Sequence, residues 1–302
     1  MRENTGKFSV GKMCKVFSVD PSCYYKWLKG IPTSRAFRRV FIASEISRIF
    51  HWSNGTYGSP RISKELSSMG IRACRSLVGK IMAEQQLRKV SKPKTRRTTV
   101  SSPKYPAAEN RLNQNFKAAR QNEAWVSDIT HIRTAEGWAY LTAVMDLFDR
   151  KVIGWSLSST MKPADTSIAA FEKARSNRPL EEGQRLIFHS DRGIQYACRE
   201  FAGMLAKNGQ ICQSMSGKGC CYDNAVAESF FRTLKSELVH RSNFATRRQA
   251  EESIFEYIEN FYNAKRRHSA LGNLTMEEFK NWGSTRMPIN LTPAGQFRPG
   301  PK

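Results

Sequence analysis

The spacing of apolar residues predicts short helices at the start of the chain. Residues 11–17 have one helical pattern, and a second helix is expected to begin at Pro21 and to end near Leu28. Residues 18–20, between the two, are typical of a turn. Two short helices about a tight turn suggest a helix-turn-helix, although many helical hairpins share this pattern.

A second pair of helices is predicted over residues 57–90. Its helices, 61–69 and 75–86, are separated by Gly70, a residue typical of a helix end. The apolar residues at helical spacing are Ile62, Leu66 and Met69 in the first helix and Leu77, Ile81 and Met82 in the second. Residues 34–50 are also helical in pattern and are expected to connect the two pairs. We therefore predict an all-α region, residues 1–90, with helix-turn-helix units at about 8–30 and 57–90.

After residue 120 the pattern changes to runs of β-branched and aromatic residues. Three such runs with short connections predict an antiparallel meander, and alternating helices and strands follow it. The expected strands are 124–132, 138–148, 151–158, 185–189 and 210–214, and the expected helices are 164–175, 199–208 and 224–239. This is the element order of a ribonuclease-H-like α/β fold. We therefore assign residues 121–240 to a core of that fold.

The charge of the chain indicates a polyanionic partner. The 302 residues include 49 Lys and Arg against 26 Asp and Glu, a formal net charge of +23. Nucleic acid is the simplest partner, although a ribosome-associated or merely basic protein would share this charge. Residues 1–105 hold 22 of the cations and 5 of the acids, so the excess lies mostly in the helical region. A membrane partner is not expected, since neither an apolar stretch of about 20 residues nor an amphipathic basic helix is evident.

The cysteines indicate where the protein works. Seven cysteines without a C-x-x-C pair favour neither a disulfide framework nor a structural zinc site. Such thiols are typical of a reducing compartment. We therefore expect a cytoplasmic protein.

Two segments outside the predicted core are distinguished by composition. Residues 91–120, which open with a stretch rich in Pro, Ser and basic residues, predict a linker that is either a solvated tether or lies along DNA. Residues 241–302 predict a helical extension that ends in a disordered tail from Pro288. The extension contains a basic cluster at 265–268, which either holds DNA or favours the C-terminus of a helix.

Three acids stand out by their position in the predicted core. Asp128 lies inside the first strand, Asp191 follows the fourth strand, and Glu228 lies in the first turns of the closing helix. Each has an ordinary interpretation, as a loop cap, a turn residue or a surface acid near a helix N-terminus. In this order, however, the three can converge at one edge of the sheet, where α/β folds bind ligands. Three carboxylates without His or Cys ligands suit Mg²⁺ or Mn²⁺.

Cations accompany these acids. Beside its apolar stripe, the closing helix has a polar stripe of Glu228, Arg232 and Lys235. An acid that holds metal, followed by two cations, suits a site where DNA phosphate meets the metal; the alternative is an ordinary ion pair at i,i+4 spacing. In the second helical pair, the candidate phosphate contacts are Arg61, Lys64, Arg72, Arg75 and Lys80.

Several segments, in this order, resemble bacterial insertion-sequence transposases with a retroviral-integrase-type core. They are Trp125-Val-Ser-Asp-Ile-Thr-His131, Asp146-Leu-Phe-Asp-Arg-Lys-Val-Ile-Gly-Trp155, His189-Ser-Asp-Arg-Gly-Ile-Gln-Tyr196 and residues 214–224, 228–237 and 262–271. The resemblance covers nearly the whole chain and is to the product of the second reading frame of such an element. It implies that Asp128, Asp191 and Glu228 form a DDE catalytic triad. It also implies that Lys235 touches the DNA of the transposon end.

The resemblance implies a DNA transposase that cuts transposon ends and transfers the 3′-hydroxyl to target DNA with two divalent ions. It further implies a homo-oligomer on DNA at the bacterial nucleoid. Because this product is often joined to an upstream frame by frameshifting, it implies a partner or fusion from that frame as well. A metal-dependent nuclease of the same fold and a non-catalytic DNA-binding regulator are the alternatives.

The chain departs from the family pattern at one point. Between Asp191 and Glu228 lie 36 residues, one more than is usual. One inserted residue in the connection between the two acids accounts for the difference. Since both flanking motifs are intact, we expect the site to function.

Overall fold

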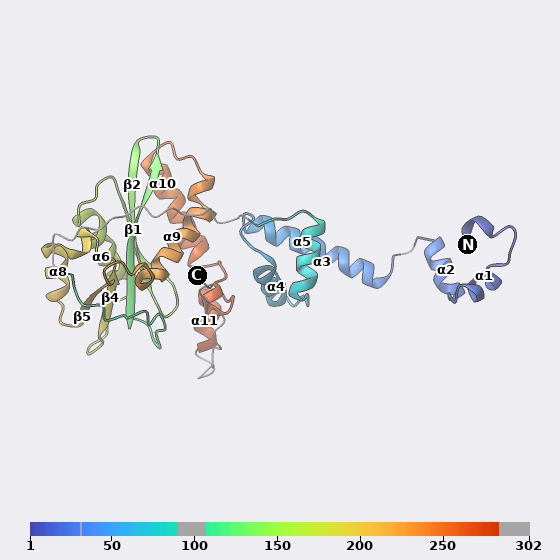
Figure 1. Ribbon diagram of the computed structural model, residues 1–302, viewed down its shortest axis with the longest axis horizontal. Coiled ribbons are helices and arrows are strands. Elements are labelled where there is room, and N and C mark those ends of the chain that lie inside the picture. The colour runs from blue at the N-terminus through green and yellow to red at the C-terminus, as the bar shows by residue number, and fades with distance from the viewer. Residues whose placement is uncertain (31, 90–106, 284–302) are drawn as a thin grey trace. The chain divides into compact units, whose positions relative to one another are not determined.

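The computed structural model describes residues 1–30, 32–89 and 107–283 (Figure 1). The chain divides into two compact units, Met1–Lys89 and Val90–Lys302. The first part of the predicted linker, up to residue 106, and the predicted tail from Pro288 lie outside the described residues. Within those ranges, no helix is both long enough and apolar enough to cross a membrane.

The first unit opens with a predicted helical pair. Its elements are the 3-10 turn η1 (Arg2–Asn4) and the helices α1 (Val10–Val16) and α2 (Pro21–Leu28). In the turn between the helices, Ser18 has a positive φ of 51°. Asp20 caps α2, because its carboxylate accepts a hydrogen bond of 2.7 Å from the backbone N–H of Ser22.

Three helices complete the first unit: α3 (Ser34–Trp52), α4 (Ser59–Ser68) and α5 (Arg75–Glu84). Although α3 is expected only to connect two pairs, it contacts both α4 and α5. Its buried residues are Ile42, Ile46 and Ile49, whose spacing gives the helix one apolar face to bury. Most of the predicted core of α4 and α5 is buried, whereas Met69 is exposed and Val78 is buried where Leu77 is expected.

The second unit is built on a mixed five-stranded sheet. Its strands are β1 (Ala124–Thr134), β2 (Gly137–Asp146), β3 (Val152–Ser158), β4 (Leu186–Ser190) and β5 (Ile211–Met215). They lie in the order β3-β2-β1-β4-β5. The first three pair antiparallel, while β4 is parallel to both β1 and β5. This arrangement confirms the predicted ribonuclease-H-like core.

Helices cover both faces of this sheet (Figure 1). One face packs against α6 and α8, and the other packs against α9, α10 and the π-helical segment η5. The bounds are η2 (π-helical, Ala164–Ile168), α6 (Ala169–Asn177), α7 (Ile194–Ala197), α8 (Arg199–Ala206), the 3-10 turn η3 (Cys221–Asn224), α9 (Ala225–Glu237), the 3-10 turn η4 (Val239–Arg241), α10 (Arg247–Phe255), η5 (Glu256–Tyr262), the 3-10 turn η6 (Ser269–Leu271) and α11 (Met276–Gly283). The sheet is therefore the middle layer of three.

Helix α6 approaches β3 so closely that position 154 has room only for glycine. A Cβ atom on Gly154 would lie 2.3 Å from the carbonyl oxygen of Ala170 and 2.5 Å from the nitrogen of Ala174. Both neighbours are backbone atoms, which cannot turn away as a flexible side chain could. Backbone-to-backbone contact thus fixes α6 against the sheet.

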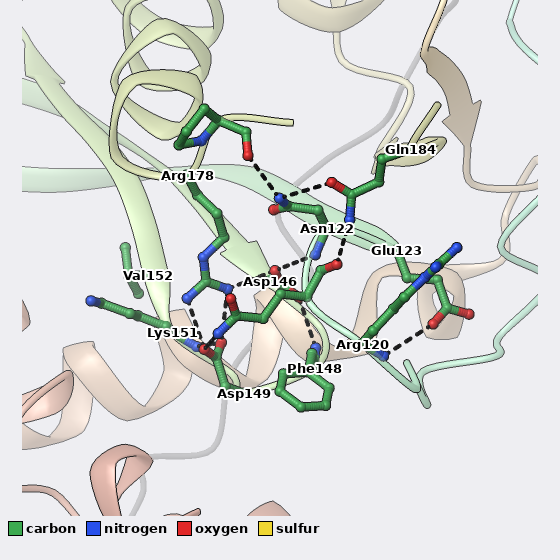
Figure 2. Close-up of polar contacts among 12 residues, drawn as sticks. Arg120, Asn122, Glu123, Asp146, Phe148, Asp149, Lys151, Val152, Arg178 and Gln184 are labelled. Atoms are coloured by element: carbon green, nitrogen blue, oxygen red, sulfur yellow. Dashed lines mark hydrogen bonds and ion pairs between the residues drawn. The ribbon is translucent and has the colours of Figure 1, made fainter. Parts of the chain in front are cut away.

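A buried ion-pair cluster fixes the end of β2 (Figure 2). The carboxylate of Asp146 accepts hydrogen bonds of 2.9 Å from the backbone N–H groups of Asn122 and Phe148, and it pairs with Arg178 at 2.6 Å. Arg178 also pairs with Asp149 at 2.8 Å. These two acids shape the turn after β2. Their ion pairs tie that turn to Arg178, the residue that follows α6.

Ion pairs also fix the segment that follows α9. Glu237 pairs with Arg266 at 2.6 Å and accepts a hydrogen bond of 2.7 Å from the Tyr257 hydroxyl. Arg267 pairs with Glu278 at 2.7 Å. Both arginines are buried. These two members of the predicted basic cluster therefore hold the fold, and the alternative that they hold DNA is wrong.

Candidate active site

Asp128 and Asp191 lie side by side because of the register of two parallel strands. Ser127 on β1 pairs with Ser190 on β4. Asp128 directly follows Ser127, and Asp191 directly follows Ser190. Since β4 ends at Ser190, Asp191 opens a loop at the carboxyl edge of the sheet, where α/β folds bind ligands. The strand order thus brings together two acids that are distant in the sequence.

Glu228 reaches the same place from the first turn of α9. Burial raises the pKa of Asp128 well above its ordinary value, and the carboxylates of Asp191 and Glu228 raise it further. Repulsion of this kind requires that the three charges lie near one another. All three predicted acids therefore meet at one site.

The three acids have the chemistry of a divalent-cation site. Carboxylate oxygens are the ligands that Mg²⁺ and Mn²⁺ prefer, and a cation would relieve the repulsion that raises the pKa of Asp128. In the part of the chain that the structure describes, no group of three or more His, Cys, Asp or Glu side chains is arranged so that it could hold a metal ion. The three acids therefore fit the predicted metal in the kind of donor they offer, but the described side chains are not arranged as a three-ligand metal group.

The loop after β4 is adapted to hold Asp191. Its Oδ1 atom accepts a hydrogen bond of 2.9 Å from the backbone N–H of Gly193. A Cβ on Gly193 would lie only 3.0 Å from this same oxygen. Glycine therefore lets the loop turn back onto the carboxylate. Arg192 anchors the loop to the end of β5 by donating a hydrogen bond of 2.6 Å to the carbonyl oxygen of Ser216.

Sequence reasoning missed the polar residues that join the three elements of the site. The Tyr196 hydroxyl lies 2.7 Å from the hydroxyl of Ser127, and the Asn224 side-chain amide donates a hydrogen bond of 3.0 Å to the Ser127 carbonyl. The Oδ1 atom of Asn224 is buried without a hydrogen-bond partner among the described residues. The signal was available, because all three residues are within six positions of a predicted acid.

The side chains of Asp223 and Asn224 do not cap α9, although both residues stand just before it. Asn224 is the N-cap of α9, but its side chain makes no capping hydrogen bond. Asp223 instead accepts hydrogen bonds from the backbone N–H of Gly217 at 2.7 Å and from the side chains of Asn110 and Gln114 at 2.9 and 2.8 Å. It therefore closes the loop that leads from β5 to Glu228.

His189 serves to join strands. It is fully buried, and its Nδ1 atom lies 2.9 Å from the hydroxyl of Ser214. That hydroxyl oxygen accepts hydrogen bonds from the backbone N–H groups of Arg111 and Leu112, so its own proton is free to be donated to the imidazole. Burial lowers the pKa of His189 to about 4, which keeps the ring neutral near pH 7.

The two predicted cations of α9 differ in exposure. Arg232 is exposed, whereas Lys235 is half-buried. Burial lowers the pKa of Lys235 and the Asp128 carboxylate raises it, so the lysine lies near the acids. The pKa of His131 on β1 is lowered mainly by burial and to a lesser degree by the charge of Lys235. The charge of Lys235 thus lies near both Asp128 and His131 on β1.

The cations predicted as DNA contacts in the first unit also divide by exposure. Arg72, Arg75 and Lys80 are exposed just before and along α5. Lys64 is half-buried on α4, and the Arg61 guanidinium lies 5.5 Å from the centre of the Tyr57 ring. Among these five predicted contacts, the exposed cations are therefore those of α5 and the turn before it.

Family models match most of the described chain. Models described as an integrase core domain match residues 118–221 and 228–282, and an HTH-like domain model matches residues 38–95. The latter includes α3, in agreement with its packing against α4 and α5.

Known proteins and solved structures are similar to the chain as well. It is 38% identical over 286 residues to "Transposase InsF for insertion sequence IS3A" of Escherichia coli (strain K12), covering 93% of this chain and 97% of that protein. It is 39% identical over 268 residues to the "Insertion element IS600 uncharacterized 31 kDa protein" of Shigella sonnei, covering 89% of this chain and 97% of that protein. The HTLV-2 integrase catalytic core domain, solved with magnesium, aligns with a TM-score of 0.39 and 17% identity over 54% of this chain and 98% of that one.

Proposed function

Since the chain belongs to the IS3-family transposases and is an enzyme of the DDE transposase and integrase class, we propose that it cuts DNA at the ends of its element and joins the freed 3′-hydroxyl to a target strand. The observation that supports this most is the register of β1 and β4, which sets Asp128 beside Asp191. The electrostatic effect of Glu228 on Asp128 supports Glu228 as the third acid of the same site.

Asp128, Asp191 and Glu228 would hold the divalent ions, Mg²⁺ or Mn²⁺, and we propose two of them. When bound, such ions polarise the scissile phosphate and lower the pKa of the attacking hydroxyl. Water attacks in the cutting step and the DNA hydroxyl attacks in the joining step, so no Ser or Tyr nucleophile is needed. Arg232 and Lys235 hold phosphates of the transposon end beside the acids, as charge-assisted contacts.

The proposed division of labour follows the chain. Residues 1–90 grip DNA, with Arg72, Arg75 and Lys80 as phosphate contacts and Arg61 and Lys64 in support. Residues 91–120 link this region to the catalytic core, 121–240. Residues 241–302 extend the core. Among the described residues of this extension, buried apolar side chains from Phe244 to Met276 lie in the same cluster as those of β1 and β2.

The reaction itself implies partners. Because two transposon ends must be joined to one target, we propose that at least two copies assemble on DNA. The product of an upstream reading frame, separate or fused, is a further proposed partner. Since its proposed substrate is bacterial DNA, the enzyme is proposed to work in the bacterial cytoplasm, at the nucleoid.

A strand-transfer assay tests the proposal. Pre-cut transposon ends are incubated with supercoiled plasmid and Mg²⁺, and joined products are expected. Asp128→Asn, Asp191→Asn and Glu228→Gln are each expected to abolish joining while DNA binding persists. Glu200→Gln, which neutralises an exposed acid of α8, is the matched control and should join DNA normally.

Two outcomes would contradict the proposal. Cleavage of the plasmid without joined products would indicate a nuclease of the same fold. Undiminished transposition in cells by any of the three acid variants would indicate that the chain acts as a DNA-binding regulator and not through the triad.

A further inference from the structure

The second half of β1 has an edge that β4 does not cover. β2 pairs with β1 along its whole length, but β4 pairs with it only from Ala124 to Ser127. From Asp128 onward, the edge faces the segment that follows α9. The two segments meet at the far end, where the backbone N–H of Ala135 donates a hydrogen bond of 2.9 Å to the carbonyl of Phe244.

Between these segments lies a groove of about 1100 Å³. We call it the β1 edge groove. It is bounded by residues 129–131 and 133–135, by Trp138 and Tyr140 of β2, and by Lys235 and residues 239, 240 and 242–244. One end adjoins the candidate triad, since residue 129 follows Asp128 and the charges of Lys235 and Asp128 interact. The groove therefore begins next to the proposed active site.

The lining combines exposed rings with cations. The Trp138 side chain is 53% exposed, an unusual state for so large an apolar group on a strand. Its ring centre lies 6.1 Å from that of His131, which lies 5.2 Å from that of Tyr140. Arg133 and Lys235 supply positive charge, and no Asp or Glu is among the described residues that line the groove.

We propose that the β1 edge groove holds a short single-stranded stretch of the DNA end, with an unpaired base stacked on Trp138 and phosphates held by Arg133 and Lys235. Aromatic faces that bind bases, beside cations that bind the backbone, are the means by which proteins hold single strands. The inference rests on the proposed function, because it needs a DNA end at the triad.

An extended peptide added to the open edge is the competing occupant. The chemistry of the groove favours DNA, for two reasons. A peptide strand would gain its affinity from backbone hydrogen bonds, but donors at both ends of this edge are already used. Ile129 donates its N–H to the Asp128 carboxylate at 2.8 Å, and Ala135 donates its N–H to the Phe244 carbonyl at 2.9 Å. The cations and the absence of acids among the lining residues suit a polyanion instead.

Binding by the full-length protein tests the inference without any need for catalysis. Fluorescence anisotropy compares a blunt duplex with the same duplex carrying a short oligo-dT extension. Wild type is expected to bind the extended duplex more tightly, and Trp138→Ala should lose this preference, on the order of tenfold, while binding the blunt duplex normally. Trp138→Phe should keep part of the preference. Phe255→Ala, which removes a similarly exposed ring on α10, should behave as wild type.

The possible outcomes separate the hypotheses. Equal affinity of wild type and Trp138→Ala for the extended duplex would overturn the inference. Reduced self-association of Trp138→Ala in sedimentation, with unchanged DNA binding, would overturn it in favour of a peptide of a second copy. If wild type fails to join pre-cut ends but keeps a Trp138-dependent preference for the extension, the proposed function fails and the groove remains. If wild type joins pre-cut ends but shows no such preference, the inference about the groove fails and the proposed function stands.

Discussion

The side-chain amide of Asn224 donates a hydrogen bond of 3.0 Å to the backbone carbonyl of Ser127. This bond joins the residue that precedes α9 to the residue that precedes Asp128, so it sets the position of Glu228 relative to the other acids. We expect Asn224→Ala to lower strand transfer at least tenfold and to lower the free energy of unfolding by about 1–3 kcal/mol, because a buried carbonyl loses its donor. DNA binding should be retained. Strand transfer equal to wild type would show that the bond does not position the site.

Gly154 should tolerate no side chain. In Gly154→Ala the new methyl would overlap the backbone of Ala170 and Ala174, and we expect a loss of about 3 kcal/mol or more in the free energy of unfolding. Gly203→Ala on α8 is the matched control, since its Cβ would meet nothing within 4 Å. It should stabilise the protein by about 0.5–1 kcal/mol through helix propensity. Thermal unfolding of both variants measures the difference.

Removing Arg178 should destabilise the second unit strongly. Arg178→Met leaves the buried carboxylate of Asp146 without its cation, at an expected cost of about 3–5 kcal/mol in the free energy of unfolding. Adding Asp146→Asn to the same chain should recover much of that loss, because the charge is then absent. Denaturant unfolding of the single and double variants tests this. A double variant no more stable than Arg178→Met would contradict the charge-based explanation.

Acid should destabilise the protein through His189. Because the pKa of the buried ring is lowered to about 4, the unfolded chain binds a proton more readily than the folded one as the pH falls below the ordinary value of about 6.5. The resulting loss in the free energy of unfolding is absent above about pH 6.5 and grows to about 3 kcal/mol near pH 4. His189→Gln should flatten the decline of unfolding free energy with falling pH. His240→Gln, at an exposed site, should leave the decline unchanged.

The exposed cations of α5 should set the salt dependence of DNA binding. Arg75→Gln and Lys80→Gln should each reduce the slope of log affinity against log salt by about one, because each removes one phosphate contact. Arg175→Gln, an exposed position on α6, should not change the slope. Titrations of the full-length protein at several salt concentrations measure these slopes. Unchanged slopes in both α5 variants would place the DNA-binding surface elsewhere.

The layered core could be predicted because its causes are local. Alternating β-branched residues and short connections specify β1 to β3, and the apolar stripe of α9 specifies the face that it buries. Asp128, Asp191 and Glu228 could be singled out in the same way, since one is a charge inside a strand, one follows a strand's carboxyl end and one lies in the first turn of a helix. The topology then determines that they meet.

The remaining features depend on partners that are distant in the sequence. Arg266 looks like a DNA-binding cation until its pairing with Glu237 is known, and the spacing of its neighbours does not reveal that pair. Asn224 likewise resembles a helix cap, because its actual partner, the carbonyl of Ser127, lies on another element. Local pattern cannot distinguish a residue that bonds within its own turn from one that bonds across the core.

The sheet face that packs against α9, α10 and η5 has a consequence for the synthesis of the protein. Ile258, Leu271 and Met276 lie in the same apolar cluster as Val126 and Leu141 of the sheet. The strands leave the ribosome long before these late residues, so part of this side of the sheet stays open to water until α11 has been translated, although α9 and α10 come earlier. A premature stop codon before residue 276 would therefore not yield a shortened enzyme; it would yield a chain that cannot close its core.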